Sequence, residues 1–143
     1  MSLGVFGYAS LLVPESIETT LGRPVPMSPP VRLRGWRRRF SQARDNLTCE
    51  KTFECLDGRR PEWILGLNVE EGEHEAGPVN GIVLELNEDD LDRLDLREIR
   101  YDRVDVTHLV EGADDLPNRI ITYKAKPDHY APEPPDDSVI LGT

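Results

Sequence analysis

Short apolar segments of strand length recur along this chain of 143 residues, and residues typical of turns separate them. Only two segments, residues 14–21 and the stretch that follows Asn87, carry the pattern of a helix. Many strands with few helices predict a mixed α+β fold, a small closed or nearly closed β-barrel with helices packed on its outside. The expected strands lie at 5–8, 31–36, 46–53, 63–69, 79–86, 103–110 and 119–125.

The helix that begins near Asn87 is the most clearly marked element. Asparagine is a favoured N-cap, and Glu88, Asp89 and Asp90 then place negative charge at the positive end of the helix dipole. The earlier helix is expected to end at Gly22, because glycine readily adopts the left-handed conformation that closes a helix.

The length and charge of the chain limit the classes of function. A chain of 143 residues favours one domain over residues 1–143, since two would leave each with a small core. The net charge of −10 argues against a general nucleic-acid or anionic-membrane binder, because phosphate affinity comes mainly from basic charge. No segment has the apolar length of a membrane span or the pattern of a secretion signal, so a cytoplasmic protein is expected.

One basic cluster departs from this acidic balance. Residues 32–39 hold five arginines around Trp36. We expect these arginines to lie on the solvent face of a strand whose other face holds Val31, Leu33 and Phe40. An RNA-contacting surface is the alternative interpretation, although the remaining acidic surface would repel phosphate.

The cysteines and histidines do not form a recognised site. Cys49 and Cys55 are six positions apart, which fits no zinc signature, and two cysteines do not make a disulfide scaffold, so free thiols are expected. His74, His108 and His129 show no motif spacing. The sequence therefore predicts no metal and no cofactor.

Glu98 stands where an apolar residue is expected. Leu91, Leu94 and Glu98 follow one another at i, i+3 and i+7, so a continuous helix would place them on one face. A partly desolvated carboxyl group has a raised pKa and exchanges protons near neutral pH. The alternative is that the helix ends before Glu98 and leaves a solvated charge or an ion pair with a nearby arginine.

The loop after the first strand, residues 8–12, is the second candidate. Consecutive N–H groups in such a loop can bind a carboxylate or an oxyanion, although an apolar run of this kind is also typical of plain core. Ser10 is disfavoured as a nucleophile, because the chain has no Gly-Xaa-Ser-Xaa-Gly elbow.

Taken in order, these motifs resemble those of the γ-glutamylcyclotransferase-like superfamily, which includes the ChaC-type and AIG2-like proteins. Residues 5–12 (VFGYASLL) are similar to its Tyr-Gly-Ser-Leu loop. Residues 94–98 (LDLRE), followed by Tyr101, are similar to its Leu-Asp-Xaa-Arg-Glu segment. Residues 79–86 and 121–125 fit the strand before that helix and a late strand of the family. The resemblance covers nearly the whole chain.

The resemblance implies a metal-independent enzyme that cyclises a small γ-glutamyl compound to 5-oxoproline and releases an amine or amino acid. It implies that Glu98 is the general acid/base, and that the N–H groups of Ala9, Ser10 and Leu11 hold the substrate carboxylate or oxyanion. It leaves open whether the protein is a monomer or a dimer. The tyrosines expected to line the pocket or orient the glutamate are Tyr8, Tyr101 and Tyr123.

Two departures from the family pattern support an alternative function. Ala9 occupies a loop position where the family usually has glycine, and the chain stops at Thr143 where relatives often continue. An added methyl group at a position that needs positive φ costs on the order of 1 kcal/mol. A non-catalytic small-molecule-binding module with the same fold is therefore the second hypothesis.

Overall fold

A computed structural model describes residues 2–8, 14–46, 54–55, 57–72 and 78–140 of the chain. Its strands are β1 (Leu3–Gly7), β2 (Val31–Leu33), β3 (Trp36–Asp45), β4 (Trp63–Glu71), β5 (Val79–Leu86), β6 (Tyr101–Asp105), β7 (Val110–Glu111), β8 (Arg119–Ala125) and β9 (Ser138–Ile140). Its helices are α1 (Pro14–Leu21), α2 (Glu88–Arg97) and a short 3₁₀ helix at Pro127–His129.

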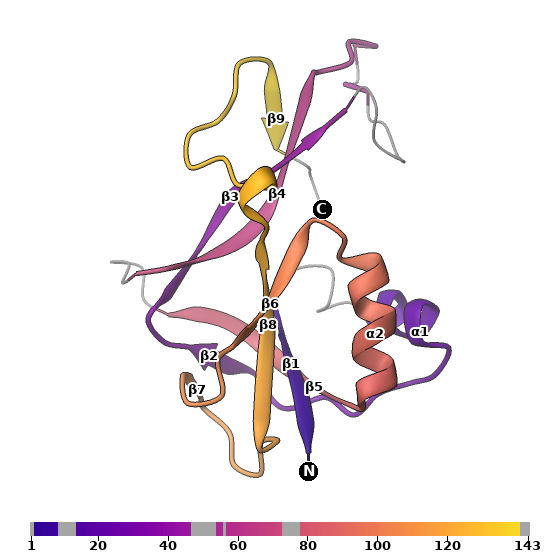
Figure 1. The fold of residues 1–143 in the computed structure, drawn as a ribbon, viewed down its shortest axis with the longest axis vertical. Helices are drawn as coiled ribbons and strands as arrows, with labels where there is room; N and C mark the ends of the chain where they lie inside the picture. Colours follow the sequence, from indigo (N-terminus) through magenta and orange to yellow (C-terminus); the bar gives the residue numbers. More distant parts are fainter. Residues whose placement is uncertain (1, 9–13, 47–53, 56, 73–77, 141–143) are drawn as a thin grey trace.

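The strands form two sheets. Six strands make the larger one in the order β6-β8-β1-β5-β2-β7, and β3-β4-β9 make the smaller one. In the larger sheet β1 runs antiparallel to β5 and parallel to β8. The result is an α+β fold with a curled, half-closed barrel, and α1 and α2 lie side by side at one side of the larger sheet (Figure 1). This confirms the predicted fold class.

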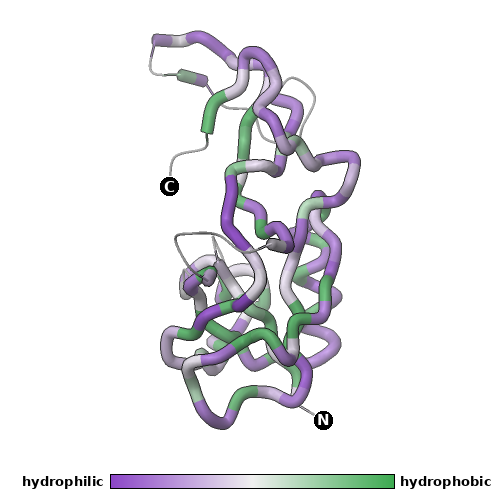
Figure 2. The backbone as a smooth tube through the Cα atoms, turned by 90° about the vertical axis from the view of Figure 1, so that its left-hand side faces the viewer, coloured by the Kyte–Doolittle hydropathy of each residue, from purple (hydrophilic) through white to green (hydrophobic). Residues whose placement is uncertain are grey.

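Residues of β1 alternate between two hydrophobic clusters, one on each face of the larger sheet. Leu3 and Val5 point toward α1 and α2, where they pack with Ile17 and Leu94. Phe6 points to the opposite face and packs inside the curl of the sheet. In Figure 2 most of the hydrophobic chain lies in the half of the molecule that contains the N-terminus. Every residue of β1 is buried, so this strand is the centre of the fold.

Both predicted helices are confirmed, and local side-chain chemistry explains their ends. The side chain of Asn87 accepts a hydrogen bond from the Asp90 N–H at 2.8 Å, and the Asp90 carboxylate accepts one from the Asn87 N–H at 3.1 Å. This reciprocal capping box satisfies two backbone groups at the start of α2. Gly22 ends α1 with a φ of 74°.

The strand predicted at residues 31–36 is confirmed at 31–33 but is too long, because β2 ends at Leu33. Gly35 has a φ of 77° and turns the chain, so Trp36 begins a new strand. Val31 and Leu33 are buried as expected, but Phe40 is 39% exposed. The turn ends β2, and a register shift between Arg39 and Gln42 interrupts β3, so the burial of Val31 and Leu33 does not extend to Phe40.

Two further strand predictions need correction. The segment 103–110 is not one strand, because the Asp105 carboxylate accepts hydrogen bonds from the N–H and the hydroxyl of Thr107 and ends β6 in a turn. The expected strand at 46–53 begins at a turn residue, Asn46, and its other positions lie outside the described residues. Strand β9, which follows the proline-rich residues 127–135, was not expected, and it pairs parallel to β4.

Candidate active site

Glu98 lies just beyond the last turn of α2. The helix ends at Arg97, so the expectation of a helical Glu98 is wrong, yet its N–H still donates to the Leu94 carbonyl oxygen at 2.7 Å. Its side chain is only 14% exposed. Burial raises the pKa of the Glu98 carboxyl, and the positive charge of Arg97, whose Nε lies 3.5 Å from Oε1, opposes that rise. Glu98 is therefore a desolvated carboxylate.

Three tyrosines from three parts of the chain lie within electrostatic reach of this carboxylate. Tyr8 follows β1, Tyr101 begins β6 and Tyr123 lies in β8. Burial is the main cause of the raised pKa of all three hydroxyls. Asp95 comes next for Tyr123 and Tyr101 comes next for Tyr8, and the Glu98 carboxylate adds a further rise to the pKa of each. The Tyr101 N–H also donates to the Glu98 carbonyl oxygen at 3.0 Å.

The hydroxyl protons of these tyrosines are donated elsewhere. Tyr8 donates to the Tyr123 carbonyl oxygen at 2.7 Å, and Tyr101 donates to the Leu67 carbonyl oxygen at 2.8 Å. Tyr123 donates to Oδ1 of Asp95 at 2.8 Å. Within the described part of the chain, no hydrogen bond is donated to the Glu98 carboxylate, which thus keeps its capacity to accept a proton.

Strand β4 comes close to this cluster. A Cβ atom placed on Gly66 would lie 3.7 Å from the Tyr101 hydroxyl and 2.8 Å from Oε1 of the buried Gln42. The positive charge of Arg44 on β3 acts to lower the pKa of Tyr101. Nothing in the sequence pointed to these residues of the smaller sheet, because Gly66, Gln42 and Arg44 belong to no recognisable motif.

The structure thus brings together four of the predicted site residues. The other three, Ala9, Ser10 and Leu11, lie outside the described residues, so their N–H groups remain a prediction. Two charged residues that sequence reasoning did not single out, Asp95 and Arg103, also contact the cluster: Asp95 accepts from Tyr123, and Arg103 pairs with Asp95.

No protein-family model and no curated protein matches this chain. Solved structures do. A structure titled gamma-glutamyl cyclotransferase superimposes with a TM-score of 0.61 at 16% identity, over 88% of this chain and 68% of that one. The chain has the γ-glutamyl cyclotransferase fold.

Two further structures share the γ-glutamyl cyclotransferase fold of this chain. The human uncharacterized protein loc79017 matches with a TM-score of 0.61 at 18% identity, over 87% of this chain and 67% of that one. The solution structure of At3g28950.1 from Arabidopsis thaliana matches with a TM-score of 0.56 at 24% identity, over 87% of this chain. This chain spans 62% of the length of the Arabidopsis protein.

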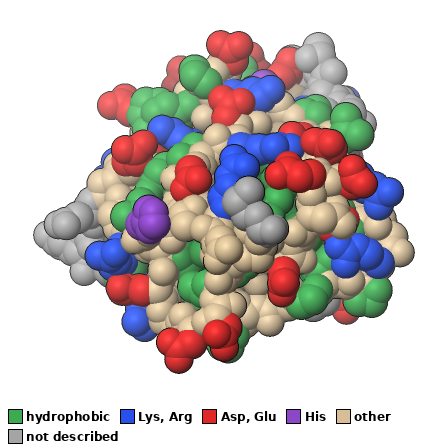
Figure 3. All heavy atoms as spheres, turned by 60° about the horizontal axis from the view of Figure 1, so that its bottom comes forward, with side chains coloured by type: hydrophobic (Ala, Val, Ile, Leu, Met, Phe, Trp, Pro, Cys, Tyr) green, Lys and Arg blue, Asp and Glu red, His purple; other side chains and the backbone are tan. Residues whose placement is uncertain are grey.

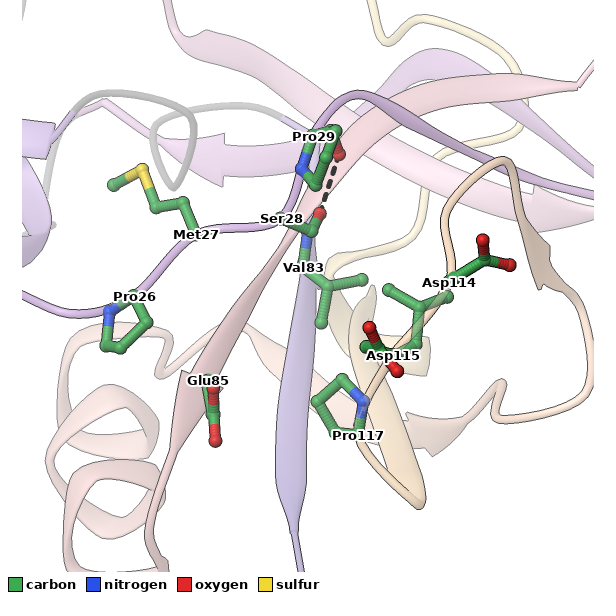
Figure 4. Close-up of a pocket in the computed structure, with 10 residues that line it drawn as sticks. Pro26, Met27, Ser28, Pro29, Val83, Glu85, Asp114, Asp115 and Pro117 are labelled. Carbon is green, nitrogen blue, oxygen red and sulfur yellow. Dashed lines mark hydrogen bonds between the residues drawn. The ribbon is translucent and has the colours of Figure 1, made fainter.

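A pocket of about 220 Å³ lies elsewhere on the γ-glutamyl cyclotransferase fold (Figure 4). The segment 26–29 and the loop 114–117 form its walls over β5, and none of the predicted site residues lines it. Glu85, Asp114 and Asp115 line this pocket together with apolar side chains and no basic residue. Three carboxylates would repel a substrate that carries carboxylates of its own, so we do not assign this pocket to a γ-glutamyl compound.

Most arginines of the basic cluster are paired with glutamates. Glu111 accepts ion pairs from Arg32 at 3.8 Å and Arg34 at 3.1 Å. Glu70 pairs with Arg37 at 3.0 Å and Arg39 at 3.1 Å. On the face shown in Figure 3, acidic and basic side chains are interspersed. These pairs reduce the positive charge that a phosphate backbone would meet.

The described residues hold no group of three or more His, Cys, Asp or Glu side chains that could bind a metal ion. Among the same residues, no helix is both long enough and apolar enough to span a membrane.

Proposed function

We propose that this protein is a γ-glutamylcyclotransferase-like enzyme that converts a γ-glutamyl compound to 5-oxoproline and a free amine or amino acid. The observation that carries this proposal is the Glu98 carboxylate, which is only 14% exposed and lies near three tyrosines whose hydroxyl protons are donated to other acceptors. Such a group is prepared to take a proton from a bound ligand. The fold, shared with a protein titled gamma-glutamyl cyclotransferase, supports the assignment.

In the proposed reaction Glu98 first accepts a proton from the substrate and later donates it to the leaving group. It first accepts a proton from the α-ammonium group of the substrate, and the freed amine attacks the γ-carbonyl carbon of the same molecule. A C–N bond forms and closes the five-membered ring. Glu98 then protonates the leaving nitrogen, the original amide C–N bond breaks as the tetrahedral oxyanion returns to a carbonyl, and the carboxylate is regenerated. The ring nitrogen gives up its remaining extra proton to the released amine, so the products are the neutral lactam and an ammonium group. The raised pKa of Glu98 lies closer to neutral pH than that of an ordinary glutamate, and a general acid/base works best when its pKa is near the working pH.

The three tyrosines supply shape in this mechanism. Their hydroxyl groups are fixed by hydrogen bonds to the protein, and burial raises the pKa of each one, so they stay neutral. Rigid walls hold a γ-glutamyl chain with its amine near its own carbonyl, which is the main requirement of an intramolecular attack. We assign the binding of the substrate carboxylate or oxyanion to the N–H groups of Ala9, Ser10 and Leu11.

The test is the substitution Glu98→Gln, with Glu88→Gln as its matched control. Both remove one carboxylate, and Glu88 is exposed at the opposite end of α2. Purified proteins are incubated with γ-glutamyl dipeptides and γ-glutamyl amines, and 5-oxoproline is measured by mass spectrometry. We expect product from the wild type and from E88Q, and a loss of roughly 100-fold or more in E98Q, where 100-fold is the lower end of the typical contribution of a general acid/base.

Equal rates for wild type and E98Q would contradict the proposal. Calorimetric titration with the same compounds tests the second hypothesis, a non-catalytic small-molecule-binding module. Binding without product in the wild type would assign the chain to the non-catalytic modules of this fold.

A further inference from the structure

Asp95 links the last turn of α2 to two neighbouring strands. Arg103 on β6 and Tyr123 on β8 are directly paired across the sheet, so their side chains leave the same face. Helix α2 covers that face, as the packing of Leu94 with Tyr123 shows. Asp95 thus lies above a cross-strand pair that can hold it from two sides.

Both carboxylate oxygens of Asp95 are used. Oδ1 accepts from Nε of Arg103 at 3.0 Å and from the Tyr123 hydroxyl at 2.8 Å, and Oδ2 accepts from Nη2 of Arg103 at 2.6 Å. The two-pronged contact with a guanidinium fixes both the distance and the plane of a carboxylate, which a lysine pair does not.

This linkage reaches the candidate site along two routes. Asp95 precedes Glu98 by three residues, so holding Asp95 also holds the turn from which Glu98 projects. Tyr123 accepts the Tyr8 hydroxyl on its carbonyl oxygen, so holding Tyr123 also holds the ring of Tyr8. One carboxylate therefore fixes the acid/base turn and two of the surrounding rings.

We propose that Asp95 is a positioning residue of this site, which through Arg103 and Tyr123 sets the Glu98 carboxylate against the tyrosine cluster. The proposal rests on the proposed function for its kinetic consequence, but its structural consequence does not require turnover.

Several charged or titratable groups face the site from the elements packed around it. Arg97 contacts Glu98 directly, and the positive charges of Arg44 and Arg100 act to lower the pKa of Tyr101. The negative charge of Asp95 and the positive charge of Arg103 cancel. Removing both would leave the net charge unchanged, whereas removing one would change it. Loss of Asp95 alone leaves the Arg103 cation and loosens the turn, and both changes favour the ionised form of Glu98.

The test compares Asp95→Ala and Asp95→Asn with Asp92→Ala. Asp92 is a matched control, because it lies one turn earlier on α2 and contacts the same Arg103 at 3.3 Å, but its side chain is 76% exposed. Carbon-13 NMR follows the carboxyl titration of Glu98, whose signal is assigned by its absence in E98Q. We expect the pKa of Glu98 to fall toward 4.5, its ordinary value, in D95A, to fall less in D95N, and to stay at the wild-type value in D92A.

Kinetics give the second measurement. In D95A we expect kcat to fall about tenfold or more while KM changes little, because Asp95 positions the acid/base without touching substrate. The acidic limb of the pH profile should move in the same direction as the NMR titration. D92A should keep the wild-type kcat.

The outcomes separate the two proposals. If the Glu98 titration in D95A matches that in D92A, the positioning role is overturned, whatever the enzyme does. If wild type forms no 5-oxoproline but the titration shifts as expected, the proposed function fails and the positioning role stands. If circular dichroism shows that D95A is unfolded, the titration of D95N decides, and an unshifted pKa in D95N overturns the proposal.

Discussion

At the scale of single residues, Glu98 is in a place that is unfavourable for a negative charge. Burial removes water from the carboxylate, and the C-terminal end of α2 adds the negative pole of the helix dipole. Arg97 offsets part of this cost, but it also donates to the hydroxyl of Thr20 on α1 at 3.2 Å. A charged group in surroundings that disfavour its charge is typical of a functional site.

This placement has a consequence for stability that pH reveals. The pKa of Glu98 is raised above 4.5 in the folded protein, so between 4.5 and the raised value the folded state binds more protons than the unfolded state. The contribution of Glu98 to stability therefore falls as pH rises through that window, by about 1.4 kcal/mol per unit of pKa difference.

We expect Glu98→Gln to remove this loss of stability at rising pH. The difference in free energy of unfolding between E98Q and wild type should grow in favour of E98Q from pH 5 to pH 8, as measured by urea denaturation. The control E88Q should show little pH-dependent difference, since Glu88 is exposed. A difference for E98Q that does not change with pH would show that ionisation of Glu98 carries no penalty.

At the scale of elements, the packing of β5 against β1 depends on a missing side chain. A Cβ atom on Gly81 would lie 2.3 Å from the carbonyl oxygen of Gly7 and 2.6 Å from the ring of Phe6. The oxygen belongs to the backbone of the central strand and cannot move independently. Gly81 thus lets β1 and β5 approach at the end of β1 that leads into Tyr8.

We expect Gly81→Ala to destabilise the fold by about 3 kcal/mol, at the upper end of typical overpacking costs. Gly66→Ala is the comparison, because the one contact of its Cβ below 3.4 Å would be with the end of the Gln42 side chain at 2.8 Å, not with backbone. Thermal unfolding measures both. Equal losses in the two variants would mean that the β1–β5 contact can relax.

At the scale of the whole molecule, a buried polar network joins the two sheets. Asn68 on β4 accepts a hydrogen bond from the Ala125 N–H of β8 at 2.8 Å, and its amide donates to the Ser41 hydroxyl at 3.1 Å. Ser41 donates to Glu70 at 2.7 Å, and arginine side chains hold Glu70 from the other side. Together with the Tyr101 contact to Leu67, this network fixes the smaller sheet beside the candidate site.

We expect Asn68→Ala to cost about 1–3 kcal/mol, because the Ala125 N–H would be left buried without a partner. Asn80→Ala, an exposed asparagine on β5, is the control and should change stability by less than about 0.5 kcal/mol. Urea denaturation measures both, and an unchanged midpoint for N68A would contradict a structural role of the network.

The sequence by itself determined the features that depend on near neighbours. The capping residues after Asn87 fix the start of α2, the glycine at position 22 ends α1, and short apolar runs mark β5 and β8. The fold class follows from the number of such segments. Phe40 shows the limit, because the turn at Gly35 and the register shift after Arg39 separate it from the buried face of Val31 and Leu33.

Only the tertiary structure decided which distant residues meet. Tyr8 and Tyr123 are 115 residues apart, and Asn68 lies 57 residues before Ala125. The contacts of Asp95 with Arg103 and Tyr123 likewise depend on how β6 pairs with β8 under α2. Caps and alternation act within a few residues, whereas burial, cross-strand pairing and the desolvation of Glu98 arise only when the sheets have closed around the site.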